Sequence, residues 1–121
     1  MLTSRSGGFI IRIIDLKSDM PPVREALHRL ERELALAARG QTRVLKLVHG
    51  YGSRGAGGDI RIAVQKCLME KVQRGEIRAC IFGEDFSKSD EATWRLLQTH
   101  AELKSDVDLG RRNRGITIVV L

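Results

Sequence analysis

The sequence predicts a small α/β domain in which a mixed four-stranded sheet packs against helices as a two-layer sandwich. Three observations support this class. Short β-branched runs recur along the chain, single amphipathic stretches separate them, and the order reads β-α-β-α-β-(α)-β. A strand, a helix and a second strand in succession favour parallel neighbours, while the direction of the last strand stays open.

The expected elements follow from the spacing of the apolar residues. β-Branched and aliphatic residues run together in four short stretches, so we expect strands at residues 9–16, 44–49, 77–82 and 116–121. Apolar residues recur every three or four positions in three other stretches, so we expect helices at residues 23–37, 60–72 and 92–103. Pro21 and Pro22 suit the start of the first helix, and Asp90 suits the N-cap of the third. Residues 1–8 are polar and end in glycine, so we expect a flexible end before a single domain over residues 9–121.

The composition describes a basic, aliphatic protein. The 121 residues include 21 lysines and arginines against 15 aspartates and glutamates, a formal net charge of +6, which favours polyanionic partners. No signal peptide and no membrane-spanning run of about 20 apolar residues is visible, so we expect a cytoplasmic protein that has no membrane partner. Cys67 and Cys80 lie in apolar runs without metal-binding spacing, and we expect reduced core thiols. Aromatic residues make up 4%, so no platform for stacking bases is expected.

The stretch from His49 to Arg61 carries the strongest functional signal. It connects a predicted strand to a predicted helix, and it contains five glycines within nine residues. Such a corner turns backbone N–H groups towards one point, where the positive end of a helix dipole also attracts anions. We therefore expect the backbone of Gly50 and Gly52 to hold a phosphate. Arg54 and Arg61 stand at the same corner and would add positive charge.

Two other interpretations of this corner stay open. Residues 50–55 match Gly-x-Gly-x-x-Gly, the pattern of dinucleotide-binding domains, but the acidic pair Glu84-Asp85 lies about 30 positions further on rather than about 20. The glycines also suit a purely structural turn. A Walker phosphate loop does not fit, because no Lys-Ser or Lys-Thr pair follows the glycines.

Asp15 and His49 are the candidate catalytic residues. Each closes a predicted strand, and parallel strands would bring both to the sheet edge where open α/β sheets bind ligands. A carboxylate and an imidazole there would support acid–base hydrolysis of a phosphodiester, and the carboxylate would alternatively help to place Mg²⁺ or Mn²⁺. In the structural alternative, Asp15 caps the turn at residues 18–19 or pairs with Lys17, and His49 is simply hydrogen-bonded. No cluster of metal-ligand residues is visible, so no metal site is assigned.

A second basic segment precedes the last strand. Arg111, Arg112 and Arg114 lie in a loop bounded by glycines, where they would straddle a nucleic-acid backbone. The alternative is a charged loop that only faces solvent.

Several of these residues also resemble the motifs of the small MutS-related (Smr) domain, over about residues 9–121. Ile14-Asp15-Leu16-Lys17-Ser18 stands where that family closes its first strand with Leu-Asp, an optional Leu, and His-Gly. Glu25-Ala26 stands in the helix that follows, and His49-Gly50-Tyr51-Gly52 matches the family's His-Gly-x-Gly turn. Residues 115–121 match its closing strand.

The resemblance implies a two-layer α/β fold like that of the C-terminal domain of a bacterial translation initiation factor. It also implies nucleic-acid binding and, in some members, endonuclease activity on DNA or RNA, with motif roles for Asp15, His49, Gly50 and Gly52. The family's first-motif histidine is Lys17 here, and the link at residues 83–114 is longer than usual. A lysine can hold a phosphate, but it shuttles protons at neutral pH only if its pKa falls greatly.

We therefore expect a DNA- or RNA-binding domain that grips phosphates through Lys17, the glycine turn and the basic loops, with weak endonuclease activity left open. The alternatives are an active metal-assisted endonuclease, which is a hydrolase, and a nucleotide- or protein-interaction module.

Overall fold

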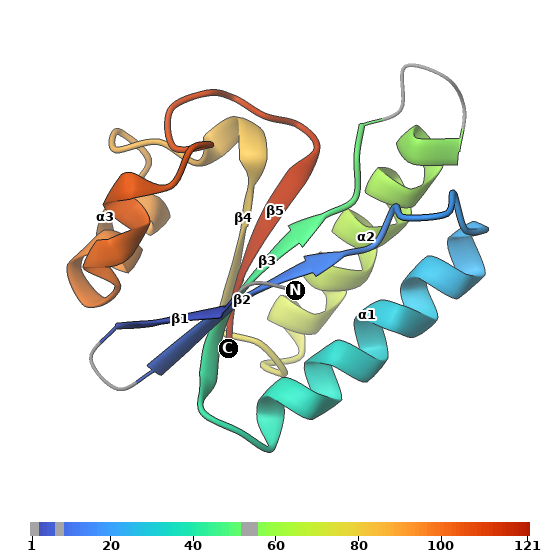
Figure 1. Ribbon diagram of the computed structural model, residues 1–121, viewed down its shortest axis with the longest axis horizontal. Coiled ribbons are helices and arrows are strands. Elements are labelled where there is room, and N and C mark those ends of the chain that lie inside the picture. Colours follow the sequence, from blue (N-terminus) through green and yellow to red (C-terminus); the bar gives the residue numbers. More distant parts are fainter. Residues whose placement is uncertain (1–2, 7–8, 52–55) are drawn as a thin grey trace.

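The computed structural model describes residues 3–6, 9–51 and 56–121 (Figure 1). Within this part of the chain, the strands and helices follow the expected order. The strands are β1 (Thr3–Ser6), β2 (Phe9–Asp15), β3 (Thr42–Val48), β4 (Ala79–Phe82) and β5 (Ile116–Val120). The helices are α1 (Val23–Ala38), α2 (Ala56–Gln73) and α3 (Glu91–Thr99), with short 3-10 helices η1 (Gly83–Asp85) and η2 (Ala101–Ser105).

The strands form one mixed sheet in the order β1-β2-β3-β5-β4. β2 and β3 are parallel, whereas β5 lies between β3 and β4 and runs antiparallel to both. The carboxyl ends of β2, β3 and β4 therefore lie at the same end of the sheet as the start of β5. The expected α/β class and mixed sheet are confirmed, and the direction of the last strand, which the sequence left open, is antiparallel.

The N-terminal segment differs from the expected flexible end. Residues Thr3–Ser6 form β1, which pairs antiparallel with β2, so the described sheet has five strands instead of four. Without β1, one side of β2 would present unpaired backbone N–H and C=O groups, and a paired strand satisfies them. This pairing uses the main chain alone, so the polar sequence of the segment carried no signal for it.

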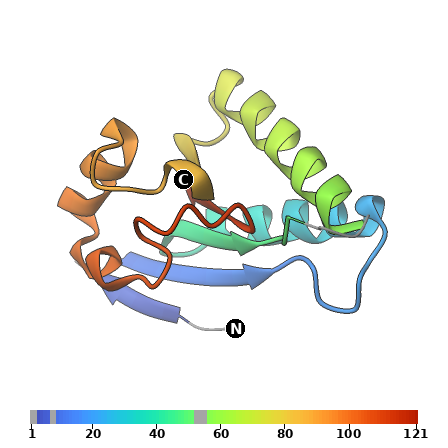
Figure 2. The ribbon, with the colours of Figure 1, turned by 90° about the horizontal axis from the view of Figure 1, so that it is seen from above.

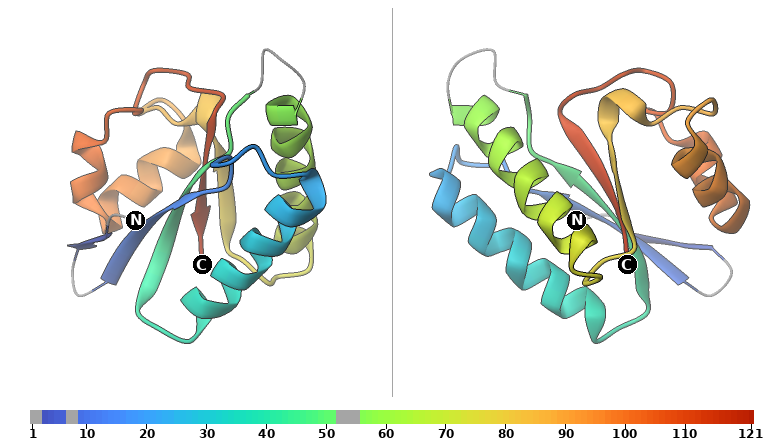
Figure 3. Two further views of the ribbon diagram at one scale, coloured as in Figure 1. Left: turned by 45° about the vertical axis from the view of Figure 1, so that its right-hand side comes forward. Right: turned by 180° about the vertical axis from the view of Figure 1, so that it is seen from behind.

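Apolar side chains form a core cluster on each face of the sheet. Helices α1 and α2 cover one face, as Figures 2 and 3 show, and the cluster there includes Leu30, Leu45 and Val64. α3 and η2 cover part of the opposite face, where Phe86 and Leu97 are buried. The two-layer arrangement of sheet and paired helices is thus extended by a partial third layer.

α3 starts where the sequence predicted, whereas α2 starts four residues earlier than predicted. α3 begins as expected, since the Asp90 carboxylate accepts a hydrogen bond from the Thr93 N–H at 3.0 Å. α2 begins at Ala56 rather than at the expected Ile60, so Asp59 lies in its first turn and is not its cap. An acidic side chain in that turn still favours the helix, because it faces the positive end of the dipole.

The cysteines and the apolar character of the helices bear on two further expectations. The thiols of Cys67 and Cys80 are free and only partly buried, each packed against the core beneath α1 and α2. None of the described helices combines the length and apolar character needed to cross a membrane.

Candidate nucleic-acid interface

Three loops come together at the end of the sheet where β2, β3 and β4 finish and β5 starts, and we call this end the rim (Figure 1). A Cβ atom added to Gly50 would lie 3.3 Å from Cδ of Lys17, and one added to Gly115 would lie 3.5 Å from Cδ1 of Tyr51. The loop after β2, the turn after β3 and the loop before β5 are therefore neighbours. Among the described residues, Lys17, Gly50 and Tyr51 thus lie close to one another and to the start of β5.

Asp15 at the end of β2 holds its own loop together. Its Oδ1 accepts hydrogen bonds from the N–H groups of Lys17 (2.9 Å) and Ser18 (3.0 Å), and its Oδ2 accepts one from the Ser18 hydroxyl (2.6 Å). Burial raises the pKa of Asp15, but these hydrogen bonds and the nearby Lys17 charge outweigh it, so the pKa is lowered. The geometry supports the structural interpretation, in which an ionised carboxylate caps the turn.

His49 lies inside the domain, with 0% of its surface exposed. Its Nδ1 is 2.7 Å from the Gly50 carbonyl oxygen, which can only accept, so Nδ1 carries the proton and donates it. Nε2 then accepts a hydrogen bond from the hydroxyl of Thr117, at 2.9 Å. Both ring nitrogens are engaged within the fold, and neither Asp15 nor an incoming phosphate has a free nitrogen to meet.

The backbone amides of the turn are engaged as well. The N–H groups of His49 and Gly50 both donate to the Gly115 carbonyl, at 2.9 and 3.0 Å. Gly50 has φ +72°, a left-handed conformation that favours glycine. The Gly50 amide, which was expected to hold a phosphate, is therefore already engaged within the fold, where it and the His49 amide join the turn to the start of β5. Gly52 and Arg54 lie outside the described residues.

The pKa of His49 predicts how acid will affect the fold. Burial lowers it below the ordinary value of 6.5, the Gly50 hydrogen bond opposes this, and Arg61 adds to the lowering. The unfolded chain then binds a proton more readily than the folded one, so the stability contribution is complete above about pH 6.5 and is lost as the pH falls.

We expect the free energy of unfolding to fall more steeply from pH 7 to pH 5 in the native protein than in His49→Gln. Denaturant titrations at a series of pH values measure this, and one proton contributes a slope of at most about 1.4 kcal/mol per pH unit. Burial also lowers the pKa of His100, but that residue is present in both proteins and cancels in the difference. Identical slopes for the two proteins would contradict the buried, neutral imidazole.

Arg61 on α2 is tied down rather than presented to solvent. Its Nη2 donates to Oε2 of Glu84 in η1, at 2.9 Å, and the two side chains are 22% and 31% exposed. The ion pair joins the first turns of α2 to the end of β4, beside His49. The expected phosphate contact of Arg61 thus competes with an internal carboxylate.

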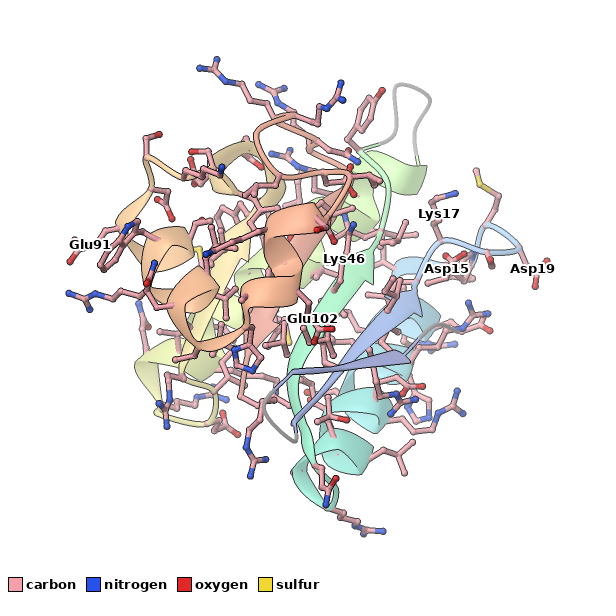
Figure 4. All side chains as sticks on the ribbon, turned by 60° about the vertical axis from the view of Figure 1, so that its left-hand side comes forward. Asp15, Lys17, Asp19, Lys46, Glu91 and Glu102 are labelled. Atoms are coloured by element: carbon pink, nitrogen blue, oxygen red, sulfur yellow. The ribbon has the colours of Figure 1, made fainter. Side chains whose placement is uncertain are left out.

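A buried lysine on β3 holds the arginine-bearing loop in place. Lys46 Nζ contacts Asp106 Oδ1 at 2.8 Å and Asp108 Oδ2 at 2.6 Å, and its side chain is only 7% exposed. Figure 4 shows Lys46 between β3 and the segment that carries η2. Burial lowers the pKa of Lys46, but the hydrogen bonds to the two aspartates outweigh it and the pKa is raised.

Asp108 passes this restraint on to the loop that carries the arginines. Asp108 Oδ1 accepts a hydrogen bond from Asn113 Nδ2, and Asn113 Oδ1 accepts one from the Gly115 N–H, both at 2.8 Å. Lys46 is therefore the residue that the functional analysis of the sequence missed. The sequence did contain a signal for it, since Lys46 is the single charged residue in the apolar run of residues 44–48. A lysine buried in a strand requires a carboxylate partner.

Close backbone packing fixes the same loop from the β4 side. A Cβ atom added to Gly83 would lie 1.7 Å from the carbonyl oxygen of Asn113 and 2.8 Å from that of Ile116. Only glycine fits at this position without moving the loop.

The arginines of the loop and Lys17 remain open to solvent. Arg111, Arg112, Arg114 and Lys17 are all exposed, and none of them has a carboxylate within ion-pair distance in the part of the chain that the structure describes. Tyr51 lies among them with 58% of its surface exposed. We call these five side chains the basic rim.

No group of three or more His, Cys, Asp or Glu side chains within the described residues is placed to hold a metal ion. Asp15, the candidate ligand for Mg²⁺ or Mn²⁺, uses both carboxylate oxygens as acceptors within its own turn. Three of the roughly four lone-pair positions of this carboxylate are thus used by its own loop.

The fold of this chain resembles that of a solved structure. The fold is similar to the crystal structure of the Smr domain of Thermus thermophilus MutS2, with a TM-score of 0.56, over 91% of this chain and 96% of that chain. The chain has an Smr-type fold. The two sequences are 20% identical, and no family model and no curated protein matches the chain significantly. The expected Smr-like architecture is confirmed.

Proposed function

We propose that this domain binds nucleic acid by its phosphate backbone at the basic rim. The observation that carries the proposal is the group of exposed cations at one end of the sheet, from two separate loops, none of which forms an ion pair in the part of the chain that the structure describes. Cations of this kind displace the counterions that surround a polyanion, which is the main sequence-independent source of affinity for nucleic acids.

The conformation of Arg112 supports the proposal. Its φ of +55° is left-handed, and for a residue with a side chain this costs about 1–2 kcal/mol. The loop accepts that cost because Lys46, Asp108 and Asn113 hold it in one shape. Strain of this kind collects at functional sites, where it positions a side chain for a ligand.

Tyr51 favours a single strand over a duplex. The low aromatic content argued against a stacking platform, yet this one ring is exposed between Lys17 and the loop before β5. An unpaired base can stack on it while the surrounding cations hold the phosphates. DNA and RNA both offer this combination.

The geometry favours binding rather than hydrolysis. Acid–base cleavage needs a nitrogen or carboxylate that is free to exchange a proton with the substrate. His49 is buried with both ring nitrogens engaged, and the exposed Asp15 carboxylate already accepts three hydrogen bonds within its own loop. We therefore propose structural roles for the two residues that were expected to be catalytic. The free thiols of Cys67 and Cys80 suit the reducing cytoplasm, where we propose that the domain acts.

Equilibrium binding to labelled single strands of DNA and RNA tests the proposal. We expect the logarithm of the affinity to fall linearly with the logarithm of the salt concentration, with a slope of about −0.7 for each phosphate contact. A flat salt dependence would reject phosphate binding and point to another kind of partner. Duplexes of the same sequence serve as the comparison for the single strands.

Replacing Tyr51 by leucine is expected to weaken single-strand binding by about five-fold or more, because one stacked base contributes about 1–3 kcal/mol. The free energy of unfolding should stay unchanged, since the ring is exposed. Trp94→Leu is the matched control, an aromatic side chain on α3 that is 55% exposed outside the basic rim. Equal effects of the two substitutions on affinity would contradict a stacking role for Tyr51.

A further inference from the structure

A polar cavity opens beside the basic rim, between η1 with its following loop and the loop before β5. These two segments lie next to each other in Figures 1 and 3. The cavity has a volume of about 680 Å³, and its lining includes Arg112 and Arg114, the hydroxyls of Ser87 and Ser89, and the acidic residues Glu84, Asp85 and Asp90. This volume is within the usual range for small-molecule sites.

Two of the three carboxylates in the cavity have structural tasks. Glu84 pairs with Arg61, and Asp90 caps α3 through the N–H and the hydroxyl of Thr93. Asp85 differs, because its side chain is exposed and takes part in no hydrogen bond or ion pair among the described residues. It faces the same cavity as two arginines with which it forms no ion pair.

An unused carboxylate is unfavourable in a site that binds only phosphates, because it repels them. It becomes useful when the ligand also presents hydrogen-bond donors. The edges of nucleobases do so, and in base recognition Asp and Glu accept from N–H groups while Arg donates to O6 and N7 of guanine. A cavity that joins a carboxylate to two guanidiniums therefore matches a base better than a phosphate.

We propose that this cavity is a subsite for one unpaired guanine of the bound strand. Guanine carries adjacent N1–H and N2–H donors that a single carboxylate can accept together, and it carries O6 and N7 acceptors for arginine. Asp85 takes the two donors, and Arg112 or Arg114 takes the acceptors. The inference rests on the proposed function, because the strand is held by the basic rim next to the cavity.

The experiment uses three labelled strands of about 15 nucleotides, long enough to fill one site. All are thymine strands, with guanine, hypoxanthine or adenine at the centre. We expect the guanine strand to bind at least about five-fold more tightly than the adenine strand, the low end for one bidentate contact. Hypoxanthine lacks the N2 amino group and should lose most of this preference.

The Asp85→Asn variant tests whether the preference for guanine over adenine arises in the cavity. The amide replaces one of the two acceptor oxygens by an NH₂ donor, so it cannot accept N1–H and N2–H side by side, and the guanine preference should fall below about two-fold. Affinity for the adenine strand should stay equal or rise, since a negative charge near the phosphates is removed. Glu70→Gln is the matched control, an exposed carboxylate on α2 that does not line the cavity, and it should keep the preference.

The outcomes separate this inference from the function on which it rests. Native protein that binds all three strands equally would overturn the guanine subsite and leave rim binding intact. A guanine preference that survives in Asp85→Asn would also overturn it, because recognition would lie elsewhere. Native protein that binds none of the strands would reject the proposed function itself.

Discussion

Replacing Lys46 by methionine is expected to lower the free energy of unfolding by about 3–5 kcal/mol, the usual cost of removing one partner from a buried ion pair. Methionine matches the length of the lysine stem but leaves the carboxylates of Asp106 and Asp108 without a cation, and these are only 13% and 16% exposed. Urea denaturation of the native and variant proteins measures the difference.

The comparison is sharpened by two further variants. Lys71→Met removes the pair with Glu31, whose side chain is 55% exposed, and should cost no more than about 1 kcal/mol. Adding Asp106→Asn and Asp108→Asn to Lys46→Met removes the unpaired charges and should restore part of the stability. We call the buried ion pairs of Lys46 with Asp106 and Asp108 the tether. A loss of stability in Lys46→Met no larger than that in Lys71→Met would contradict its role in holding the loop.

The same ion pairs stabilise the fold only within a limited pH range. Burial raises the pKa of Asp108, but the hydrogen bonds from Lys46 and Asn113 outweigh it, so the pKa is lowered. Its contribution is complete above the unfolded value of about 3.9 and is lost as the pH falls below it. The pKa of Lys46 is raised, so its contribution is complete below the ordinary value of 10.5 and is lost as the pH rises through the folded value.

Local patterns were enough to predict most of the fold. The β-branched runs of β2, β3 and β5 and the spacing of leucines along α1 each report burial through neighbouring residues in sequence. The Asp90 cap is equally local, because the acceptor and the donor are three residues apart. β1 escaped prediction because a short polar strand is specified by its partner's free edge and not by its own side chains.

The sequence predicted where the candidate site lies, but not the hydrogen bonds and ion pairs that its residues form. The gathering of Asp15, Lys17 and the glycine turn at one end follows from parallel strands. The inward direction of His49 does not, because it depends on β5 pairing beside β3 and bringing Thr117 opposite Leu47. The partners of Lys46 likewise lie 60 residues away in sequence, so only the folded chain reveals the tether.

Replacing Arg112 and Arg114 together by glutamine is expected to produce the largest loss of binding. Both side chains are exposed and line the edge of the cavity beside the basic rim, and neither supports the fold through an ion pair among the described residues. On a thymine strand, which offers no guanine to the cavity, each lost phosphate contact weakens the salt slope by about 0.7, so the pair should weaken it by about 1.4. The free energy of unfolding should not fall, and relief of electrostatic repulsion between the two cations can raise it slightly.

The control for this variant removes the same charge from the opposite end of the molecule. Arg39 and Arg74 are exposed and follow the last residues of α1 and α2, far from the rim along both helices. Their double replacement by glutamine lowers the net charge equally. It should shift the affinity only slightly and leave the salt slope unchanged, because distant charges are screened beyond about 10 Å at 0.1 M salt.

The most direct test is the salt slope of binding to a thymine strand, measured side by side for the native protein, the Arg112→Gln/Arg114→Gln variant and the Arg39→Gln/Arg74→Gln control. Binding at the basic rim predicts that the slope weakens by about 1.4 in the first variant and stays at the native value in the control. Equal slopes for all three proteins, or an equal change in both variants, would show that the strand is not held by these arginines.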